Sequence, residues 1–315
     1  MNETNEAGWE RKVIEQLAFE SLKEARRKRR WSIFFRALGF VYFGVLIFLL
    51  ARGGSESTHI DGGGQHTALV QLEGVIGASS EVKAEETIEA LQAAFEAKSA
   101  KGVVLRINSP GGSPVQAGMI YDEIRRLRAK YPDKPVYAVV EDVCASGGYY
   151  VAAAADKIYV DKASIVGSIG VRMDGFGFTG TMEKLGVERR SITAGENKAF
   201  LDPFSPQNPK HVEFAKGMLA EIHQQFIDVV RQGRGKRLKE TPEMFSGLFW
   251  SGAKSIELGL ADELGTLDSV ARDVLKAEEV RDYTKRENVA ERLAKRFGAG
   301  VSASVLQELD RFSVK

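Results

Sequence analysis

Residues 103–114 read VVLRINSPGGSP, and residues 142–150 read DVCASGGYY. In the first stretch a buried strand runs into two glycines, and Ser113 and Pro114 then supply an N-cap and a first-turn proline for a helix. The second stretch also joins a strand to a helix. Glycine permits the positive φ that a sharp turn needs, and amides at such a turn can bind an anion or an oxyanion. Either motif alone also fits a plain tight turn.

Strand-like runs and amphipathic stretches alternate on both sides of these turns, starting at Thr67. We expect strands at 67–76, 102–108, 135–141, 157–160, 164–171 and 187–192, and helices at 84–98, 114–130 and 146–156. This alternation predicts an α/β fold with a largely parallel sheet.

Beyond Pro209 the pattern becomes helical. Apolar residues recur at steps of three and four, which predicts a helix with a buried stripe: Val212, Ala215, Leu219, Ile222, Phe226 and Val229. The basic run GRGKRLK (233–239) after this helix is typical of a solvated turn. The charged stretch YTKRENVAERLAKRFG (283–298) predicts a solvated helix.

The composition excludes several classes of protein. The chain has 315 residues, of which 43% are hydrophobic and 28% charged, so a sizeable core can form. The net charge of +1 argues against a nucleic-acid partner bound through a broad basic surface. Because Cys144 is the one cysteine, no disulfide framework can form within the chain.

The N-terminal end predicts a membrane anchor. Residues 1–36 carry nine Lys or Arg against six Glu, and residues 31–51 then contain one charge, Arg36. About 20 apolar residues span a bilayer, and an arginine near one end can reach the headgroups. We therefore expect a cytoplasmic charged segment at 1–30, a transmembrane helix at 31–52 and a flexible linker at 53–66. The excess of Lys and Arg before the span places the rest of the chain outside the cell or in the periplasm.

Ser146, at the SGG turn, is a candidate nucleophile because a serine at a strand-to-helix junction can expose its hydroxyl. None of the four histidines lies in the loop setting of a triad base: His59 and His66 fall in the linker, and His211 and His223 on the long helix. A desolvated, neutral lysine can serve instead. Lys198, in the loop TAGENKAFLDPF (193–204), is the candidate base.

Four blocks together resemble bacterial signal peptide peptidases of the SppA type, over about residues 67–275. These blocks are SPGG (109–112), CASGGYYVAAAADKI (144–158), SIVGSIGV (164–171) and TAGENKAFLDPF (193–204). The resemblance implies a fold like that of the ClpP/crotonase superfamily, with stacked β-β-α units around a superhelical core. It implies no cofactor and no metal. Residues 276–315 would follow as a charged helical segment.

The resemblance also implies residue roles. Ser146 would be the nucleophile and Lys198 the general base, while the amides of Gly111 and Gly112, joined by Gly147, would hold the oxyanion. AGENK departs from the commoner aromatic residue before the lysine, which leaves the detail of the pocket open.

Further expectations follow from the same resemblance. Ser168 would orient the lysine, and a neighbouring copy in a homo-oligomer could complete the dyad. The substrates would be hydrophobic signal-peptide remnants in the lipid bilayer. Cys144, two residues before the serine, is expected to be buried behind the turn rather than to be a nucleophile.

Two alternatives remain at this point. The chain could be a sister peptidase, similar to SohB or to the stomatin-associated peptidases, that acts on membrane proteins. It could also be a non-catalytic anchored scaffold, although the two glycine turns, Ser146 and Lys198 together speak against that.

Overall fold

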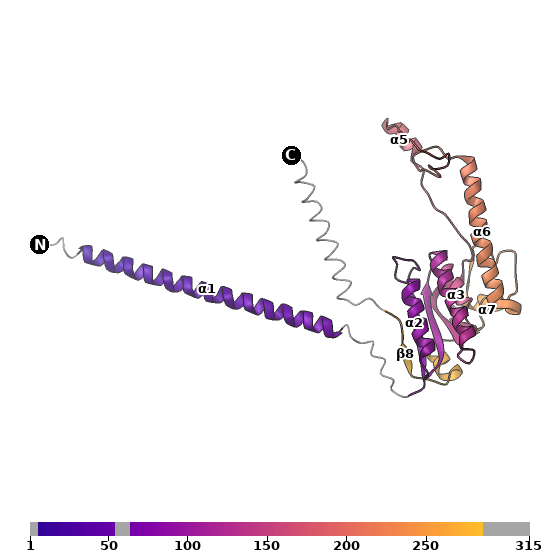
Figure 1. Cartoon of the computed structure of the whole chain (residues 1–315), viewed down its shortest axis with the longest axis horizontal. Helices are drawn as coiled ribbons and strands as arrows, with labels where there is room; N and C mark the ends of the chain where they lie inside the picture. The colour runs from indigo at the N-terminus through magenta and orange to yellow at the C-terminus, as the bar shows by residue number, and fades with distance from the viewer. Residues whose placement is uncertain (1–5, 54–63, 286–315) are drawn as a thin grey trace. The chain divides into compact units, whose positions relative to one another are not determined.

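The computed structural model describes residues 6–53 and 64–285, and it describes only the backbone of residues 6–18, 21, 22, 25 and 46–53 (Figure 1). Of these, residues 64–285 belong to one compact unit, and the helix of residues 6–53 belongs to another. Most of the expected linker and most of the helix expected at 283–298 lie outside the described residues.

The N-terminal unit contains α1 (Glu6–Gly53), one continuous helix of 48 residues. The membrane span expected at 31–52 lies within α1, but the side chains of residues 46–53 lie outside the described part. Among the residues that were described, no helix is both long enough and apolar enough to cross a membrane. The anchor therefore stays a prediction.

The second unit is built on one mixed sheet with the order β6-β5-β3-β2-β1-β8, in which β4 pairs with β3 and with β7. All described pairings are parallel except β5 with β6. The strands are β1 (His66–Glu73), β2 (Ala100–Ser109), β3 (Val136–Ala145), β4 (Lys157–Val160), β5 (Ile165–Gly167), β6 (Phe249–Ser251), β7 (Glu263–Leu264) and β8 (Val280–Asp282). The predicted α/β class and its largely parallel sheet are confirmed.

The helices of this unit lie between the strands in sequence. They are α2 (Ala84–Glu96), α3 (Pro114–Lys130), α4 (Gly147–Ala152), α5 (Thr179–Leu185), α6 (Pro209–Arg234), α7 (Gly252–Glu257) and α8 (Leu267–Ser269), with the short turns η1 (Gly235–Arg237) and η2 (Val270–Val274). Figure 1 shows α2 and α3 side by side over one face of the sheet. The helix expected at 114–130 is confirmed with both ends correct, since Ser113 accepts from the Gln116 amide as its N-cap.

The strands alternate their side chains between two cores, as the two-residue period of a strand requires. In β2, Val103, Leu105 and Ile107 face the larger core under the helices, while Val104 faces a smaller cluster on the other side of the sheet. The smaller cluster is covered by residues of η2, among them Val270. The central strands are thus buried on both faces, as parallel strands usually are.

The strand expected at 187–192 is wrong. These residues form no strand, and the helix α5 precedes them instead. Val187 is 55% exposed and Ile192 is fully exposed, so no neighbouring strand covers the apolar side chains that suggested β structure. A β-like pattern forms a strand only where a partner strand pairs with it.

The C-terminal edge of the sheet extends beyond residue 275. β8 pairs in parallel with β1, and Thr67 lies opposite Val280. Next to this pairing, His66 is fully buried, and its Nε2 lies 2.9 Å from the Tyr283 hydroxyl. Burial lowers the pKa of the His66 imidazole. The placement of His66 in a flexible linker is therefore wrong: it is the first residue of the sheet.

The long helix α6 is confirmed, but its stripe is less buried than expected. Of the six predicted positions, Ala215 and Phe226 are buried and the others are partly exposed. The helix packs on α4 only near its C-terminal end, where a Cβ on Gly233 would lie 2.0 Å from the Ala153 carbonyl oxygen. The first turns of α6 therefore lack a core to cover them.

The basic run 233–239 is not a solvated turn over its whole length, because Arg234, the last residue of α6, is buried. Its guanidinium is 1% exposed and forms two 2.9 Å hydrogen bonds to the carboxylate of Asp262. Burial by itself would raise the pKa of Asp262, but the hydrogen bonds from Arg234 and the Ile158 amide and the charges of Arg234 and Arg237 together lower it. The pair ties the end of α6 to the loop before β7.

We expect Arg234→Ala to lower the free energy of unfolding by about 3 kcal/mol, because it removes both hydrogen bonds from the buried guanidinium to Asp262 and leaves Arg237, at 3.2 Å, as the charged partner of that carboxylate. Urea denaturation of the full chain in detergent, followed by circular dichroism, measures this. Arg190→Ala is the matched control: Arg190 pairs with Glu188 at the surface, and its loss should change stability by less than about 0.5 kcal/mol. Equal effects of the two substitutions would contradict a structural role for the buried pair.

Candidate active site

Ser146 occupies a strained turn between β3 and α4. Its φ is 50° and its ψ is −123°, in a region that residues with a side chain rarely adopt. The Ser146 amide donates to the Gly167 carbonyl at 2.9 Å, and its own carbonyl accepts from the Tyr150 amide at 2.9 Å. Such strain costs about 1–3 kcal/mol and is typical of functional sites. Ser146 is only partly buried, so its hydroxyl can be reached.

The SPGG turn lies directly against this serine. A Cβ on Gly111, whose φ is +95°, would lie 2.5 Å from the Gly147 nitrogen and 2.7 Å from the Ser146 Cβ. A Cβ on Gly112 would lie 2.0 Å from the Ile76 carbonyl oxygen. The two glycine turns that the sequence singled out are therefore in contact at Gly111, which has no room for a side chain, while Gly112 must lack one because of Ile76.

The amides of the three predicted oxyanion-hole residues differ in their availability. The Gly111 amide donates to Ser109 Oγ at 3.1 Å, so it is already engaged. In the described part of the chain, the amides of Gly112 and Gly147 have no protein acceptor. Gly147 is the first residue of α4, where an amide has no partner within the helix. Among the three predicted residues, Gly112 and Gly147 are therefore the two whose amides are not engaged within the described part of the chain.

Ser168, predicted to orient the lysine, directly follows β5, whose last residue, Gly167, accepts from the Ser146 amide. β5 pairs with the end of β3, and Ala145 lies opposite Gly167. Ser168 also has a positive φ, 52°, and its amide donates to the Leu248 carbonyl at 2.7 Å. Two strained serines thus flank one another at the carboxyl end of the sheet.

Lys198 does not lie near Ser146 within the chain. Lys198 is exposed in a turn whose neighbour Asn197 contacts His211 at the start of α6. His223, twelve residues further along α6, contacts the Ile169 carbonyl beside Ser168 at 3.1 Å. At about 1.5 Å per residue, these two contacts are roughly 18 Å apart along the helix. Figure 1 shows α5 and the loop after it at the far end of α6.

Cys144 is fully buried at the end of β3, as expected. Burial raises the pKa of its thiol far above the usual value. A thiol that is neither ionised nor accessible is not a nucleophile, so Ser146 is the only one of the two side chains that substrate can reach.

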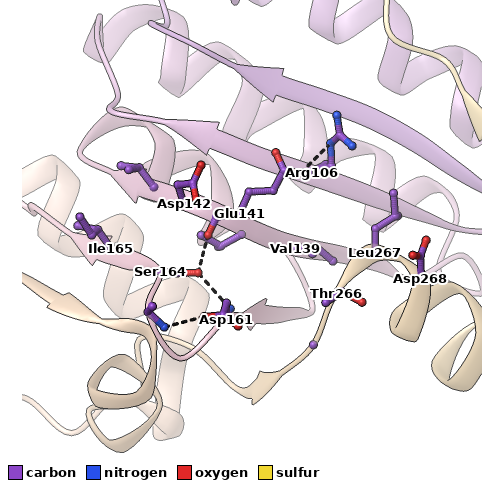
Figure 2. Close-up of a pocket in the computed structure, with 14 residues that line it drawn as sticks. Arg106, Val139, Glu141, Asp142, Asp161, Ser164, Ile165, Thr266, Leu267 and Asp268 are labelled. Atoms are coloured by element: carbon purple, nitrogen blue, oxygen red, sulfur yellow. Dashed lines mark hydrogen bonds and ion pairs between the residues drawn. The ribbon is translucent and has the colours of Figure 1, made fainter.

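A cavity of about 610 Å³ lies beside β3 (Figure 2). No motif in the sequence indicated it. Arg106 and Glu141 line it, 3.5 Å apart, and Ser164 Oγ donates to the Glu141 carbonyl at 2.5 Å. None of the predicted site residues lines this cavity. Its polar groups bond to one another, and in the described residues no cluster of metal-ligating side chains is found there or elsewhere.

We expect Gly111→Ala to lower the turnover rate by about 100-fold or more, because the added Cβ would push the Gly112 amide of the SPGG turn away from Ser146 and the Gly147 amide. Hydrolysis of a hydrophobic peptide measures the rate. Gly217→Ala is the matched control, since a Cβ at Gly217 on α6 meets nothing within 4 Å. An active Gly111→Ala protein would show that the contact between the turns has no part in catalysis.

Comparison with known proteins identifies the fold and the class. The family described as "Peptidase family S49" matches residues 128–281, and the family described as "Clp protease" matches residues 67–166. The second match agrees with the expected ClpP/crotonase-like arrangement of the sheet.

Of the three relatives reported next, the second and third are named as a peptidase or a protease. The chain is 50% identical over 182 residues to a Brucella melitensis protein named "Na(+)/H(+) antiporter NhaA". The aligned residues cover 58% of the chain and 25% of that protein. It is 31% identical over 189 residues to "Putative signal peptide peptidase SppA" of Enterococcus faecium, covering 60% of the chain and 54% of the relative. It is 31% identical over 192 residues to "Putative protease slr0021" of Synechocystis sp., covering 61% of the chain and 68% of the relative.

The aligned part of the chain thus spans a quarter of the antiporter and about half of the Enterococcus relative. The Synechocystis relative is matched over two thirds of its length, and the family match covers the strands and helices that carry Ser146. The chain belongs to peptidase family S49 and is similar to peptidases of the SppA type.

Proposed function

We propose that the chain is a membrane-anchored serine endopeptidase that uses Ser146 and Lys198 to degrade the remnants of cleaved signal peptides. The observation that carries the proposal is the strained Ser146 beside the two unengaged amides of Gly112 and Gly147. A turn held in this conformation presents a hydroxyl and two donors to one incoming carbonyl.

The reaction follows from these groups. The Lys198 amine takes the Ser146 hydroxyl proton while Oγ bonds to the substrate carbonyl carbon. The carbonyl oxygen gains the electron pair and accepts hydrogen bonds from Gly112 and Gly147. The lysine then gives the proton to the leaving amine, the C–N bond breaks, and an acyl-enzyme remains. Water, deprotonated by the same lysine, releases the acid and restores the Ser146 hydroxyl.

The lysine in this reaction comes from a neighbouring copy of the chain. Within one chain Lys198 is held at the end of α6 remote from Ser146. The segment around it exposes many apolar side chains, which is typical of a surface that another protein covers: Met173, Phe176, Leu185, Val187, Ile192 and Phe204. Such cover would also remove water from the lysine, and a desolvated lysine is more easily neutral.

Hydrophobic signal-peptide remnants suit the surroundings of the SPGG turn. Val75, Val115 and Met119 all lie within a few residues of this turn or of its bridge partner Ile76, and all three are exposed. The predicted anchor at 31–52 would hold the enzyme at the membrane, with the N-terminus in the cytoplasm and the peptidase unit on the outer side. Substrates left in the bilayer would then lie close to it.

We expect Ser146→Ala and Lys198→Ala each to lower hydrolysis of a hydrophobic peptide by about 10⁴-fold or more, because each removes one member of the dyad. Lys184→Ala, which removes an exposed lysine on α5, is the control and should be active. Full activity of the Lys198→Ala protein would refute the dyad. Peptides retained by the Ser146→Ala protein identify the substrate: membrane-protein fragments instead of signal peptides would favour the SohB-like alternative.

A dyad shared between copies predicts complementation. Ser146→Ala and Lys198→Ala proteins, unfolded together and refolded into mixed oligomers, should regain about a quarter of the wild-type activity, since random pairing places one intact serine beside one intact lysine at that frequency. Rates of the mixture and of each variant refolded alone give the comparison. An inactive mixture whose oligomers contain both variants would place both dyad members in one chain.

A further inference from the structure

The Lys198 loop is a small turn with its own internal bonds. The Lys198 amide donates to the Gly195 carbonyl at 3.1 Å, and the Phe200 amide donates to the Asn197 carbonyl at 3.1 Å. Gly195 has a φ of +104°, and Leu201 is held at +52° although it has a side chain. A turn that contains a strained leucine and is mostly exposed needs contacts outside itself to keep its geometry.

Those contacts come from the first turns of α6, on both sides of the lysine. Asn197 Oδ1, one residue before Lys198, lies 3.2 Å from His211 Nε2. The ring of Phe200, two residues after Lys198, lies 5.0 Å from the His211 ring and 5.7 Å from the Phe214 ring. His211 therefore contacts the loop before and after the lysine with one side chain.

Helix α6 can hold this loop in place relative to the rest of the peptidase unit. Its other end is anchored in the body of the peptidase unit, where Phe226 packs 5.0 Å from the Tyr150 ring and Val230 is fully buried. On the opposite side of the loop, Asp202 accepts from Ser205 Oγ at 2.7 Å and lies 3.5 Å from Arg189. The loop that contains Lys198 is thus held against the first turns of α6.

We propose that His211 is a positioning residue that sets the place and direction of the Lys198 amine. The proposal rests on the proposed role of Lys198 as the base, and it goes beyond that role by naming what holds the lysine in place. With Asn197 oriented as in the structure, His211 Nε2–H donates to the amide oxygen, while the same ring packs at a tilt against the Phe200 ring.

Histidine is suited to both contacts at once, and two substitutions separate them. His211→Phe keeps a ring against Phe200 but has no donor for Asn197. His211→Gln keeps an N–H donor but has no ring. His211→Ala loses both. Because a displacement of about 1 Å at a reacting group can reduce a rate by about 100-fold, each loss should act on turnover more than on binding.

The test measures kcat and KM of the full-length oligomer on a hydrophobic peptide, with the rate at which a serine-reactive phosphonate labels Ser146. We expect His211→Ala to lower kcat and the labelling rate by about 10- to 100-fold with KM within about twofold. His211→Phe and His211→Gln should each recover part of the loss. Lys216→Ala, an exposed residue one turn further along α6, is the control and should match the wild type.

A double-mutant cycle with Asn197→Ala isolates the hydrogen bond. If that bond positions the lysine, the double variant is no slower than His211→Ala alone, because the second substitution removes nothing more. Thermal melting and oligomer size, unchanged from the wild type, exclude unfolding as the cause.

The outcomes separate this proposal from the dyad itself. Inactive Lys198→Ala with wild-type kcat in His211→Ala would overturn the positioning role and leave the dyad standing. Fully active Lys198→Ala would overturn both. If the reductions in kcat caused by His211→Ala and Asn197→Ala multiply in the double variant, the two side chains act independently. That result would also overturn the proposed positioning of Lys198 by the His211–Asn197 hydrogen bond.

Discussion

The site depends on the close approach of two backbone turns. β2 and β3 are adjacent parallel strands, so their carboxyl ends deliver the SPGG and SGG turns to the same edge of the sheet. The turns meet at Gly111, where even a methyl group would lie 2.5 Å from the Gly147 nitrogen. This constraint places two unengaged amides beside Ser146. It also means that the proposed oxyanion donors are backbone groups, because no side chain fits between the turns.

The strain at Ser146 is sustained by packing on the far side of α4. The fully buried Tyr149 donates its hydroxyl to the Leu260 carbonyl at 2.7 Å, and Gly233 allows α6 to pack closely on Ala153. The Arg234–Asp262 pair then fixes the end of α6 to the segment before β7. Because α4 is only six residues long, it has little stability of its own. The contacts of α4 with the Leu260 segment and with α6 therefore stabilise this short helix.

The sequence predicted the parts of this fold that depend on local pattern. Helix 114–130 and strand 157–160 follow from capping and periodicity, and the two glycine turns mark the site. What it missed depends on partners distant in the chain. Arg234 is buried because Asp262 lies opposite it, and residues 187–192 form no strand because no strand is there to pair with. Likewise, nothing in the pattern near Lys198 indicates that His211 contacts its loop, because that contact joins two elements whose spacing is set by the fold.

The two members of the proposed dyad differ in how they are held: Ser146 is fixed by the central sheet, and Lys198 lies in a loop at the N-terminal end of α6. Ser146 is held by the central sheet, so its geometry is complete in a single chain. The base stands at the free end of a 26-residue helix whose first turns have no core beneath them. A single copy would then have a formed oxyanion site without a base close enough to deprotonate the serine. On this proposal, peptide hydrolysis begins only where a second copy supplies the lysine, and the assembly itself keeps the isolated chain inactive.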